Sequence, residues 1–210
     1  MSARRQVGAA ARRRFAGGLH AGRTRTRDDP RAALRRRLMA KLGAGTCRVF
    51  DAFAGDGGHW REAWREAAGY VGCDAAWHRD GRVAFVAVPE RVMRAVDLAE
   101  FTVFDLDARG NAWACASILA RRRRLGPGER IGLIVSTRAG RKSELPLGLA
   151  RLAGAARRGP GAPSSAARAA LYMRAIESMA RAMGGRIAWL HAAGNPPGAY
   201  GAVIQATGSE

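Results

Sequence analysis

The chain has 210 residues, a formal net charge of +19 and a hydrophobic content of 48%. This content is enough for one domain with a full core and excludes wholesale disorder. No apolar run approaches the roughly 18 residues of a membrane span, and no apolar block follows the first arginines as in a secretory signal. The three cysteines are far apart and the histidines form no ligand-spaced pair. We therefore expect a cytoplasmic protein with no membrane partner, disulfide or metal.

The positive charge has two explanations. Of the 36 basic residues 34 are arginine, and alanine and glycine are abundant, as a GC-rich genome produces without selection for binding. Residues 1–48, however, hold fourteen basic residues against two acidic ones, and a uniform bias does not concentrate charge in this way. We therefore expect a polyanionic partner, with nucleic acid (RNA or DNA) first.

The chain changes character near residue 28. Residues 1–27 are Arg, Ala and Gly with little periodicity, and we interpret them as a flexible basic arm in front of a domain spanning 28–210. Asp29 suits a helix N-cap and Pro30 a first helical turn. Leucines then repeat at every fourth position until two glycines end the pattern: Leu34, Leu38, Leu42, Gly43 and Gly45. Several basic residues of this helix form either a solvated face or a phosphate-binding ridge: Arg31, Arg35, Arg36 and Lys41.

From residue 48 onward, short apolar runs alternate with helical stretches. The predicted strands are Arg48–Ala54, Tyr70–Asp74, Val83–Val88, Thr102–Asp107, Ile131–Thr137, Arg186–Ala192 and Ala202–Ala206. The predicted helices are Gly58–Ala68, Glu90–Ala99, Ala112–Arg124 and Ser165–Met183. This alternation predicts an α/β, Rossmann-like fold with a seven-stranded, mostly parallel sheet and helices on both faces. The last two strands are joined too closely for a crossover helix, so we expect an antiparallel C-terminal pair.

Two connections and one charged run stand out. The eight residues between the second and third strands leave no room for a helix. Residues Arg138–Ser164 are rich in Gly, Pro and Arg, and we expect a long loop of functional importance. The four arginines Arg121–Arg124 at a helix end either bind the last carbonyl groups or contact phosphates.

The most informative stretch is V-F-D-A-F-A-G-D-G-G-H-W, from Val49 to Trp60. Ligands of open α/β sheets bind at the carboxyl ends of the strands, and Gly55 and Gly57 directly follow the first strand. Trp60 stands where a dinucleotide fingerprint has its third glycine, which disfavours a nicotinamide cofactor, and the G-K-[ST] of a P-loop is absent. His59 either contacts a ligand beside this turn or, more commonly for such a residue, only packs.

The motif D-x-F-x-G-x-G, which contains Asp51, Phe53, Gly55 and Gly57, resembles motif I of class I S-adenosylmethionine-dependent methyltransferases. The resemblance covers about residues 48–206. It implies S-adenosylmethionine as cofactor, with the glycine turn beside its methionine part. It also implies an acidic residue on the ribose hydroxyls at the end of the second strand, where Asp74 stands. The alternative for Asp74 is a turn residue that closes a strand.

The third strand departs from this pattern. Many family members carry an acidic residue at its end, near the adenine amine, whereas this strand ends Val88-Pro89-Glu90. Either Glu90 binds the amine from one turn later, or the protein does without this interaction.

The fourth strand leads into V-F-D-L-D-A-R-G-N-A-W. This segment resembles D-x-D-P-F-G-S-P of tRNA guanine-N2 methyltransferases and D-L-D-A-Y-G-S-P-W of small phage-type proteins. The matching positions are Asp105, Asp107, Gly110 and Trp113. Strand alternation places the two acidic residues on the opposite face from Phe104 and Leu106.

The resemblance implies methylation of an exocyclic amine on a base. A carboxylate that accepts the amine hydrogens orients the nitrogen and takes its proton, and Asp107, with Asp105 beside it, is the catalytic candidate. Arg109 stands at the base-stacking position and Trp113 is its possible substitute. Arg138 follows the fifth strand, where related proteins often have an acid, and is a third substrate-binding candidate. The alternative for Asp105 and Asp107 is capping and ion pairing with neighbouring arginines.

The sequence therefore predicts a methyltransferase that acts on a base amine in RNA or DNA. Two alternatives remain open. One is a catalytically degenerate protein that keeps the fold and binds nucleic acid without methyl transfer. The other is a methyltransferase for a protein or small molecule, with arginines that reflect genome composition alone.

Overall fold

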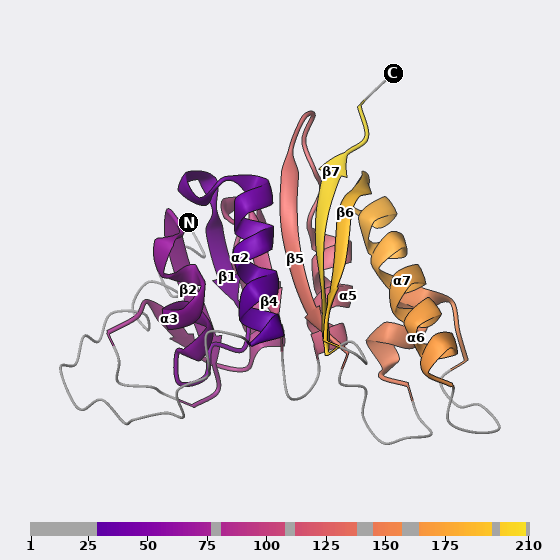
Figure 1. Ribbon diagram of the computed structural model, residues 1–210, viewed down its shortest axis with the longest axis horizontal. Helices are drawn as coiled ribbons and strands as arrows, with labels where there is room; N and C mark the ends of the chain where they lie inside the picture. The colour runs from indigo at the N-terminus through magenta and orange to yellow at the C-terminus, as the bar shows by residue number, and fades with distance from the viewer. Residues whose placement is uncertain are drawn as a thin grey trace, which may run out of the picture.

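The computed structural model describes residues 29–76, 81–107, 112–137, 145–156, 164–194 and 198–208 (Figure 1). The predicted basic arm, residues 1–27, lies outside this part of the chain. Within it, no helix has the length and apolar character needed to cross a membrane.

A seven-stranded sheet organises the molecule. The strands are β1 (Arg48–Asp51), β2 (Gly69–Asp74), β3 (Ala84–Val86), β4 (Val103–Leu106), β5 (Arg130–Ser136), β6 (Gly185–Ala193) and β7 (Ala199–Ala206). Their order is β3-β2-β1-β4-β5-β7-β6. The pairs from β3 to β5 are parallel, and β7 runs antiparallel to both β5 and β6. The predicted mostly parallel α/β sheet and its antiparallel C-terminal pair are confirmed.

The helices connect these strands. They are α2 (Pro30–Leu42), α3 (Gly58–Glu62), α4 (Pro89–Ala95), α5 (Ala112–Arg122), α6 (Leu147–Ala153) and α7 (Ser165–Ala182), with short 3-10 turns at Ala44–Thr46, Trp64–Glu66 and Leu98–Glu100. The Asp29 carboxylate accepts the Arg31 N–H at 2.9 Å, as an N-cap does, and Pro30 begins the helix. The predicted start and end of this first helix are confirmed.

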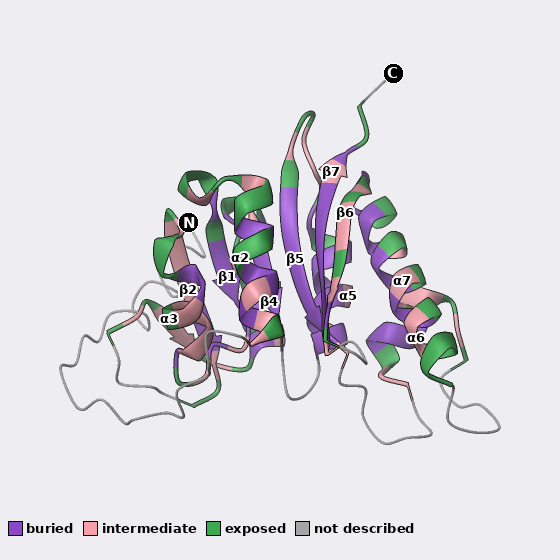
Figure 2. Cartoon of the chain, viewed as in Figure 1, coloured by how far each residue is buried: buried purple, intermediate pink, exposed green. Residues whose placement is uncertain are grey.

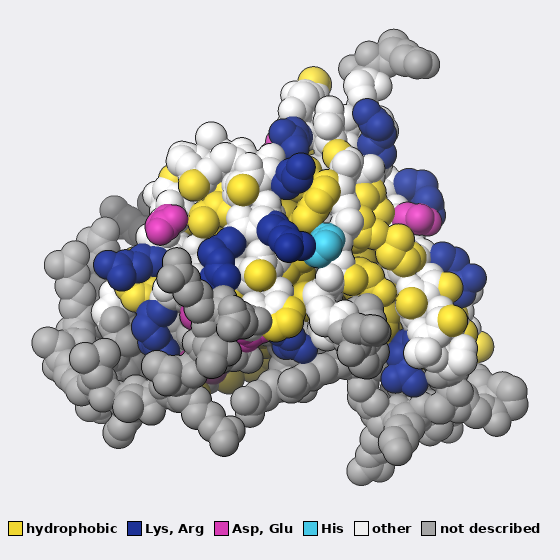
Figure 3. All heavy atoms as spheres, in the orientation of Figure 1, with side chains coloured by type: hydrophobic (Ala, Val, Ile, Leu, Met, Phe, Trp, Pro, Cys, Tyr) yellow, Lys and Arg dark blue, Asp and Glu magenta, His cyan; other side chains and the backbone are white. Residues whose placement is uncertain are grey.

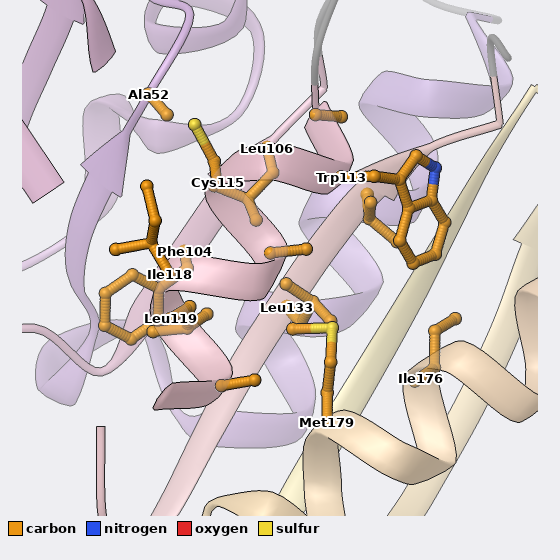
Figure 4. Close-up of a cluster of buried hydrophobic side chains, with 14 of the residues drawn as sticks. Ala52, Phe104, Leu106, Trp113, Cys115, Ile118, Leu119, Leu133, Ile176 and Met179 are labelled. Atoms are coloured by element: carbon orange, nitrogen blue, oxygen red, sulfur yellow. The ribbon is translucent and has the colours of Figure 1, made fainter. Parts of the chain in front are cut away.

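Two hydrophobic clusters cover the two faces of the sheet. The larger cluster packs α4, α5, α6 and α7 against one face and contains Phe104 and Leu106 (Figure 4). The smaller one packs α2 and the turn that follows α3 against the other, and it contains Leu34, Leu38 and Trp64. Figure 2 shows the strands β5 and β7 buried along most of their length. The central strands therefore present only their ends to a ligand, whereas β6 at the edge of the sheet keeps exposed side chains along its length.

One expected loop contains a helix. Residues 138–164 were predicted as a loop, but α6 forms within them, at Leu147–Ala153, while 138–144 and 157–163 lie outside the described residues. A glycine allows α6 to pack closely, since a Cβ added at Gly148 would lie 2.1 Å from the Trp113 carbonyl oxygen. Leu149 and Leu152 supply the apolar face of this helix, and the surrounding Gly, Pro and Arg residues obscure it in the sequence.

Most of the arginine run at the end of α5 has structural roles. The Arg122 guanidinium donates to the carbonyl oxygens of Met93 and Val96, at 2.6 and 3.1 Å, and so ties α5 to α4. Arg123 is buried and forms an ion pair with Glu129, and Arg124 donates to carbonyl oxygens of its own helix end. These contacts support the helix-end interpretation of the run.

Candidate functional site

The glycine turn after β1 has the backbone that the sequence predicts. Gly55 and Gly57 have φ angles of +47° and +82°, in the left-handed region where glycine is favoured. Asp51 is fully buried; its carboxylate accepts the Phe53 N–H at 3.2 Å and the Tyr70 hydroxyl at 2.9 Å. Asp51 and Phe53 therefore hold the start of the turn in place.

Asp74 closes the turn from the end of β2. One of its carboxylate oxygens accepts the Gly55 N–H at 2.9 Å and the other accepts the Ala76 N–H at 2.8 Å. A carboxylate oxygen has two lone pairs and can accept more than one hydrogen bond. The structure thus brings Gly55 and Asp74 together, two residues that are 19 positions apart in the sequence.

An arginine from the connection between β2 and β3 lies over this turn. The Arg82 guanidinium donates to the carbonyl oxygens of Ala54 and Gly55, at 3.1 and 2.7 Å. A Cβ at Gly57 would lie 2.8 Å from the Arg82 Cζ atom, so a larger residue there would push the guanidinium out of this position. Arg82 therefore places a positive charge directly against the glycine turn.

Glu90 is the second residue of α4 and approaches the same region. Burial and then the charges of Asp74, Asp51 and Glu90 raise the pKa of the Cys73 thiol to about 12. Three of the predicted cofactor-binding carboxylates thus lie near one buried thiol on β2.

Asp105 of β4 and Asp107, which directly follows this strand, belong to a buried ion-pair network. Arg35 of α2, which is 1% exposed, binds Asp105 through Nε at 2.6 Å and Asp107 through Nη2 at 2.8 Å. Arg31 binds the other oxygen of Asp107 at 2.7 Å, and the Trp64 indole N–H donates to Asp105 at 2.7 Å. The predicted alternative role of these aspartates, ion pairing with arginines, is therefore present. For Arg35 both expected roles, in a solvated face or in a phosphate-binding ridge, are wrong, because its guanidinium is buried against carboxylates.

This network keeps Asp105 ionised. Burial opposes the charged form, but the charges of Arg35 and His59 and the N–H donors of Arg35 and Trp64 outweigh it. They lower the pKa of Asp105 to about 2.

His59 lies between the carboxyl ends of β1 and β4. Its Nδ1 atom lies 3.6 Å from Asp51 and 3.8 Å from Asp105, and its Nε2 atom lies 4.0 Å from Asp107. Burial and the charge of Arg35 oppose protonation of the ring, but Asp51 and Asp105 outweigh them and raise the His59 pKa. The ring is thus an ionisable group between three carboxylates at the carboxyl edge of β1 and β4.

Asp51, His59 and Asp105 offer ligand atoms within 4.8 Å of one another, close enough to consider a metal ion. Arg35 and Trp64 already donate to Asp105, and the guanidinium repels a further cation. The donor set therefore fits a protonated histidine better than a divalent metal.

The substrate-binding candidates have different outcomes. Arg109 and Arg138 lie outside the described residues. Trp113 is corrected: its indole has no exposed surface and stacks on Tyr172 at a centroid distance of 5.6 Å, within the core of Figure 4. A side chain enclosed in this way has no face left for a base, because α6 and α7 cover it.

Comparison with solved structures identifies the fold of the chain. No family model and no curated protein matches the chain. Among solved structures, a candidate hemolysin from Lactococcus lactis matches with a TM-score of 0.52 at 10% identity, over 85% of this chain and 87% of that chain. The N-methyltransferase NodS from Bradyrhizobium japonicum, in complex with S-adenosylhomocysteine, matches with a TM-score of 0.51 at 9% identity, over 88% and 89%. Trm1 from Pyrococcus horikoshii, in complex with S-adenosylmethionine, gives 0.49 at 15% identity, over 85% and 56%.

The fold is that of the class I methyltransferases. Its strand order and its antiparallel seventh strand account for the predicted resemblance, and the glycine turn lies at the carboxyl end of β1 as that resemblance implies. At identities near 10% the likeness concerns the methyltransferase fold alone.

Sequence reasoning missed four side chains that shape the site. They are Arg35, Trp64, Tyr70 and Arg82. Each contacts a predicted site residue or the glycine turn from a distant part of the chain, and no local spacing signals such a contact. Arg35 has no acidic residue near it within α2. This was the one sequence signal that could have directed attention to Asp105 and Asp107 as its partners.

Proposed function

We propose that the chain is an S-adenosylmethionine-dependent methyltransferase that methylates a base amine of RNA or DNA. The proposal is supported mainly by the hydrogen bond from Gly55 to Asp74, because it joins the glycine turn to the carboxylate that we expect to bind the ribose.

The residues present fit this cofactor. A Cβ at Gly55 would meet no atom closer than 3.9 Å, so the turn leaves room against its backbone. Asp74 would accept the ribose hydroxyls, while Arg82 offers a guanidinium to the carboxylate of the methionine part. Glu90 would lie toward the base. When bound, the cofactor supplies a sulfonium methyl group, whose bond to sulfur breaks as its bond to the amine nitrogen forms.

The chain's own part in the chemistry centres on Asp107. It follows β4 at the carboxyl edge, and each of its oxygens keeps a lone pair beside its arginine contact. Because the Asp107 side chain is only 1% exposed, an amine would have to take the place of the more exposed Arg31, and the carboxylate would then orient its nitrogen toward the methyl group. NodS, an N-methyltransferase of the same fold, supports an amine as acceptor. The net charge of +19 supports a nucleic acid as the molecule that carries it.

One observation favours a second candidate function. The side chains of Asp105 and Asp107 are 0% and 1% exposed and neutralised by Arg31 and Arg35. A protein that has lost catalysis and binds nucleic acid would tolerate this use of both carboxylates for stability.

Calorimetric titration of S-adenosylmethionine and S-adenosylhomocysteine tests the proposal. We expect binding to the wild type, weakened about 10-fold or more by Asp74→Ala, which corresponds to about 1.4 kcal/mol. Asp97→Ala is the matched control, because Asp97 is exposed and caps a 3-10 turn before β4, at the opposite end of the strands. If the folded wild type binds neither compound, the proposal that the chain is a methyltransferase is wrong. Binding without transfer of labelled methyl groups to RNA or DNA supports the second candidate.

A further inference from the structure

One face of the molecule combines exposed cations with a stacked aromatic pair. It lies beside α2 and over β5, β7 and β6, and we call it the α2–β6 face. Its residues are Arg37, Lys41, Arg130, Arg186, Trp189 and His191. All are exposed except Trp189, which is half-buried. Figure 3 shows Lys and Arg side chains gathered around a histidine on this side of the molecule.

Strand register places these side chains on the same side of the sheet. Arg130 of β5 and Arg186 of β6 both pair with Gln205 of β7, so the three side chains form one row across the strands. The Arg130 guanidinium also donates to the Lys41 carbonyl oxygen at the end of α2. Helix α2 covers part of this side, since its leucines pack against Gly132 of β5 and Gly201 of β7, and in Figure 1 no other described helix lies over it.

The aromatic pair is arranged as a platform. The rings of Trp189 and His191 stack at 5.9 Å with an interplanar angle of 14°. The indole packs partly against the cluster beneath α2, and Arg37 lies with Nη1 2.7 Å from the His191 Nε2 atom. A fixed ring pair beside a guanidinium offers a stacking surface for an unpaired base and a charge for the phosphate next to it.

The face continues toward the candidate site. From Gln205 to Ala199, strand β7 runs about 20 Å at the usual rise per residue. Near its start, Arg31 donates to the Gly198 carbonyl oxygen through Nη2 and to Asp107 through Nη1. Strand β7 itself is buried from Ala199 to Ile204, so a bound strand would pass along its neighbour β6. Ala193, at the end of β6, pairs with Ala199 next to Gly198, so this path also ends at the carboxyl edge of β4.

We propose that the α2–β6 face binds a single-stranded segment of nucleic acid, with phosphates on its four cations and a base on the His191–Trp189 pair. The proposal rests on the proposed function, since the same strand would continue to the site at the end of β4. Charge complementarity selects a polyanion, and the exposed ring pair selects unpaired bases over a duplex, whose bases are stacked on one another.

Fluorescence anisotropy with labelled single-stranded RNA, single-stranded DNA and duplex DNA of one sequence tests the proposal on the full chain. The face variant is Arg37→Gln with Lys41→Gln, Arg130→Gln and Arg186→Gln. We expect the slope of log affinity against log salt to fall by about 2–3 for a single strand, at roughly 0.7 per phosphate contact. His191→Ala should weaken single-strand binding about 10-fold at constant salt, with a nearly unchanged slope. The RNA and DNA arms show which nucleic acid supplies the strand.

A matched control removes four exposed arginines from α5, α6 and α7: Arg121, Arg151, Arg174 and Arg181, each replaced by Gln. Equal losses in the face and control variants overturn the proposal, and so does duplex DNA bound as tightly as a single strand. If the wild type binds nucleic acid and the face variant binds it equally well, only the face is wrong. If the wild type binds none, the nucleic-acid part of the proposed function fails as well, while cofactor binding to both proteins still reports on the methyltransferase site.

Discussion

Arg35 decides the electrostatics of the strand ends, because a single guanidinium compensates two buried carboxylates, those of Asp105 and Asp107. Arg35→Met keeps much of the side-chain volume but leaves Asp105 without its main counter-charge. We expect a loss of about 3–5 kcal/mol in the free energy of unfolding, as for other buried pairs that lose one partner. Chemical denaturation measures it.

Arg36→Met is the control for that measurement, because Arg36 is exposed on the same helix and donates to the Glu62 carbonyl oxygen at 3.2 Å. We expect it to cost less than about 1 kcal/mol. Equal losses in the two variants would mean that the buried network contributes nothing beyond an exposed helix contact.

His59 gives the strand ends a pH dependence. Because folding raises its pKa above the unfolded value of 6.5, its contribution to stability is fully present below that pH and is lost as pH rises through the folded pKa. We therefore expect His59→Asn to be less stable than the wild type at pH 5.5–6.5, with the difference shrinking toward pH 9. Urea denaturation at a series of pH values measures this difference. A gap that widens above pH 7 would show that the ring is buried in its neutral form.

At the scale of elements, the close approach of α6 to α5 depends on Gly148. A Cβ there would meet the Trp113 carbonyl carbon at 2.5 Å and the Ser117 hydroxyl oxygen at 2.9 Å, and backbone atoms cannot move aside without shifting a helix. We expect Gly148→Ala to destabilise the protein by about 2 kcal/mol or more, through overpacking. Gly45→Ala, where a Cβ would have nothing within 4 Å, is the control for unfolding measurements. If the two variants have the same stability, α6 does not pack against Trp113 and Ser117 as closely as described.

The elements also show what a sequence can predict. The number and direction of the strands follow from local patterns and connection lengths, so the mostly parallel sheet and the glycine turn at the end of β1 were predictable. The partners of Asp105 were not, since Arg35 is 70 residues away and lies next to the leucines that mark the buried stripe of α2. For Trp113, the sequence placed an aromatic residue near the substrate loop. Of the two helices that enclose it, α7 was predicted, whereas α6 comes from a segment of weak pattern.

On the scale of the whole molecule, positive charge of α2 lies directly beside the candidate site. The N-terminal end of α2 lies at the carboxyl edge of the sheet, since Arg31 reaches Asp107 there. The described chain begins at this edge, with Asp29, and the sequence before it, residues 1–27, contains eight arginines and no acidic residue.

Deletion of residues 1–27 separates the remaining explanations of the arginine content. If the arm binds phosphates, the truncated protein should bind RNA or DNA more weakly, and the salt dependence should fall by roughly 0.7 for each phosphate that the arm neutralises on a single strand. Binding of S-adenosylmethionine, measured by calorimetry, should stay at the wild-type level, because Gly55 and Asp74 are untouched. Unchanged nucleic-acid binding and salt dependence would show that the arginines of the arm reflect genome composition. The acceptor would then have to be sought through the α2–β6 face or among proteins and small molecules.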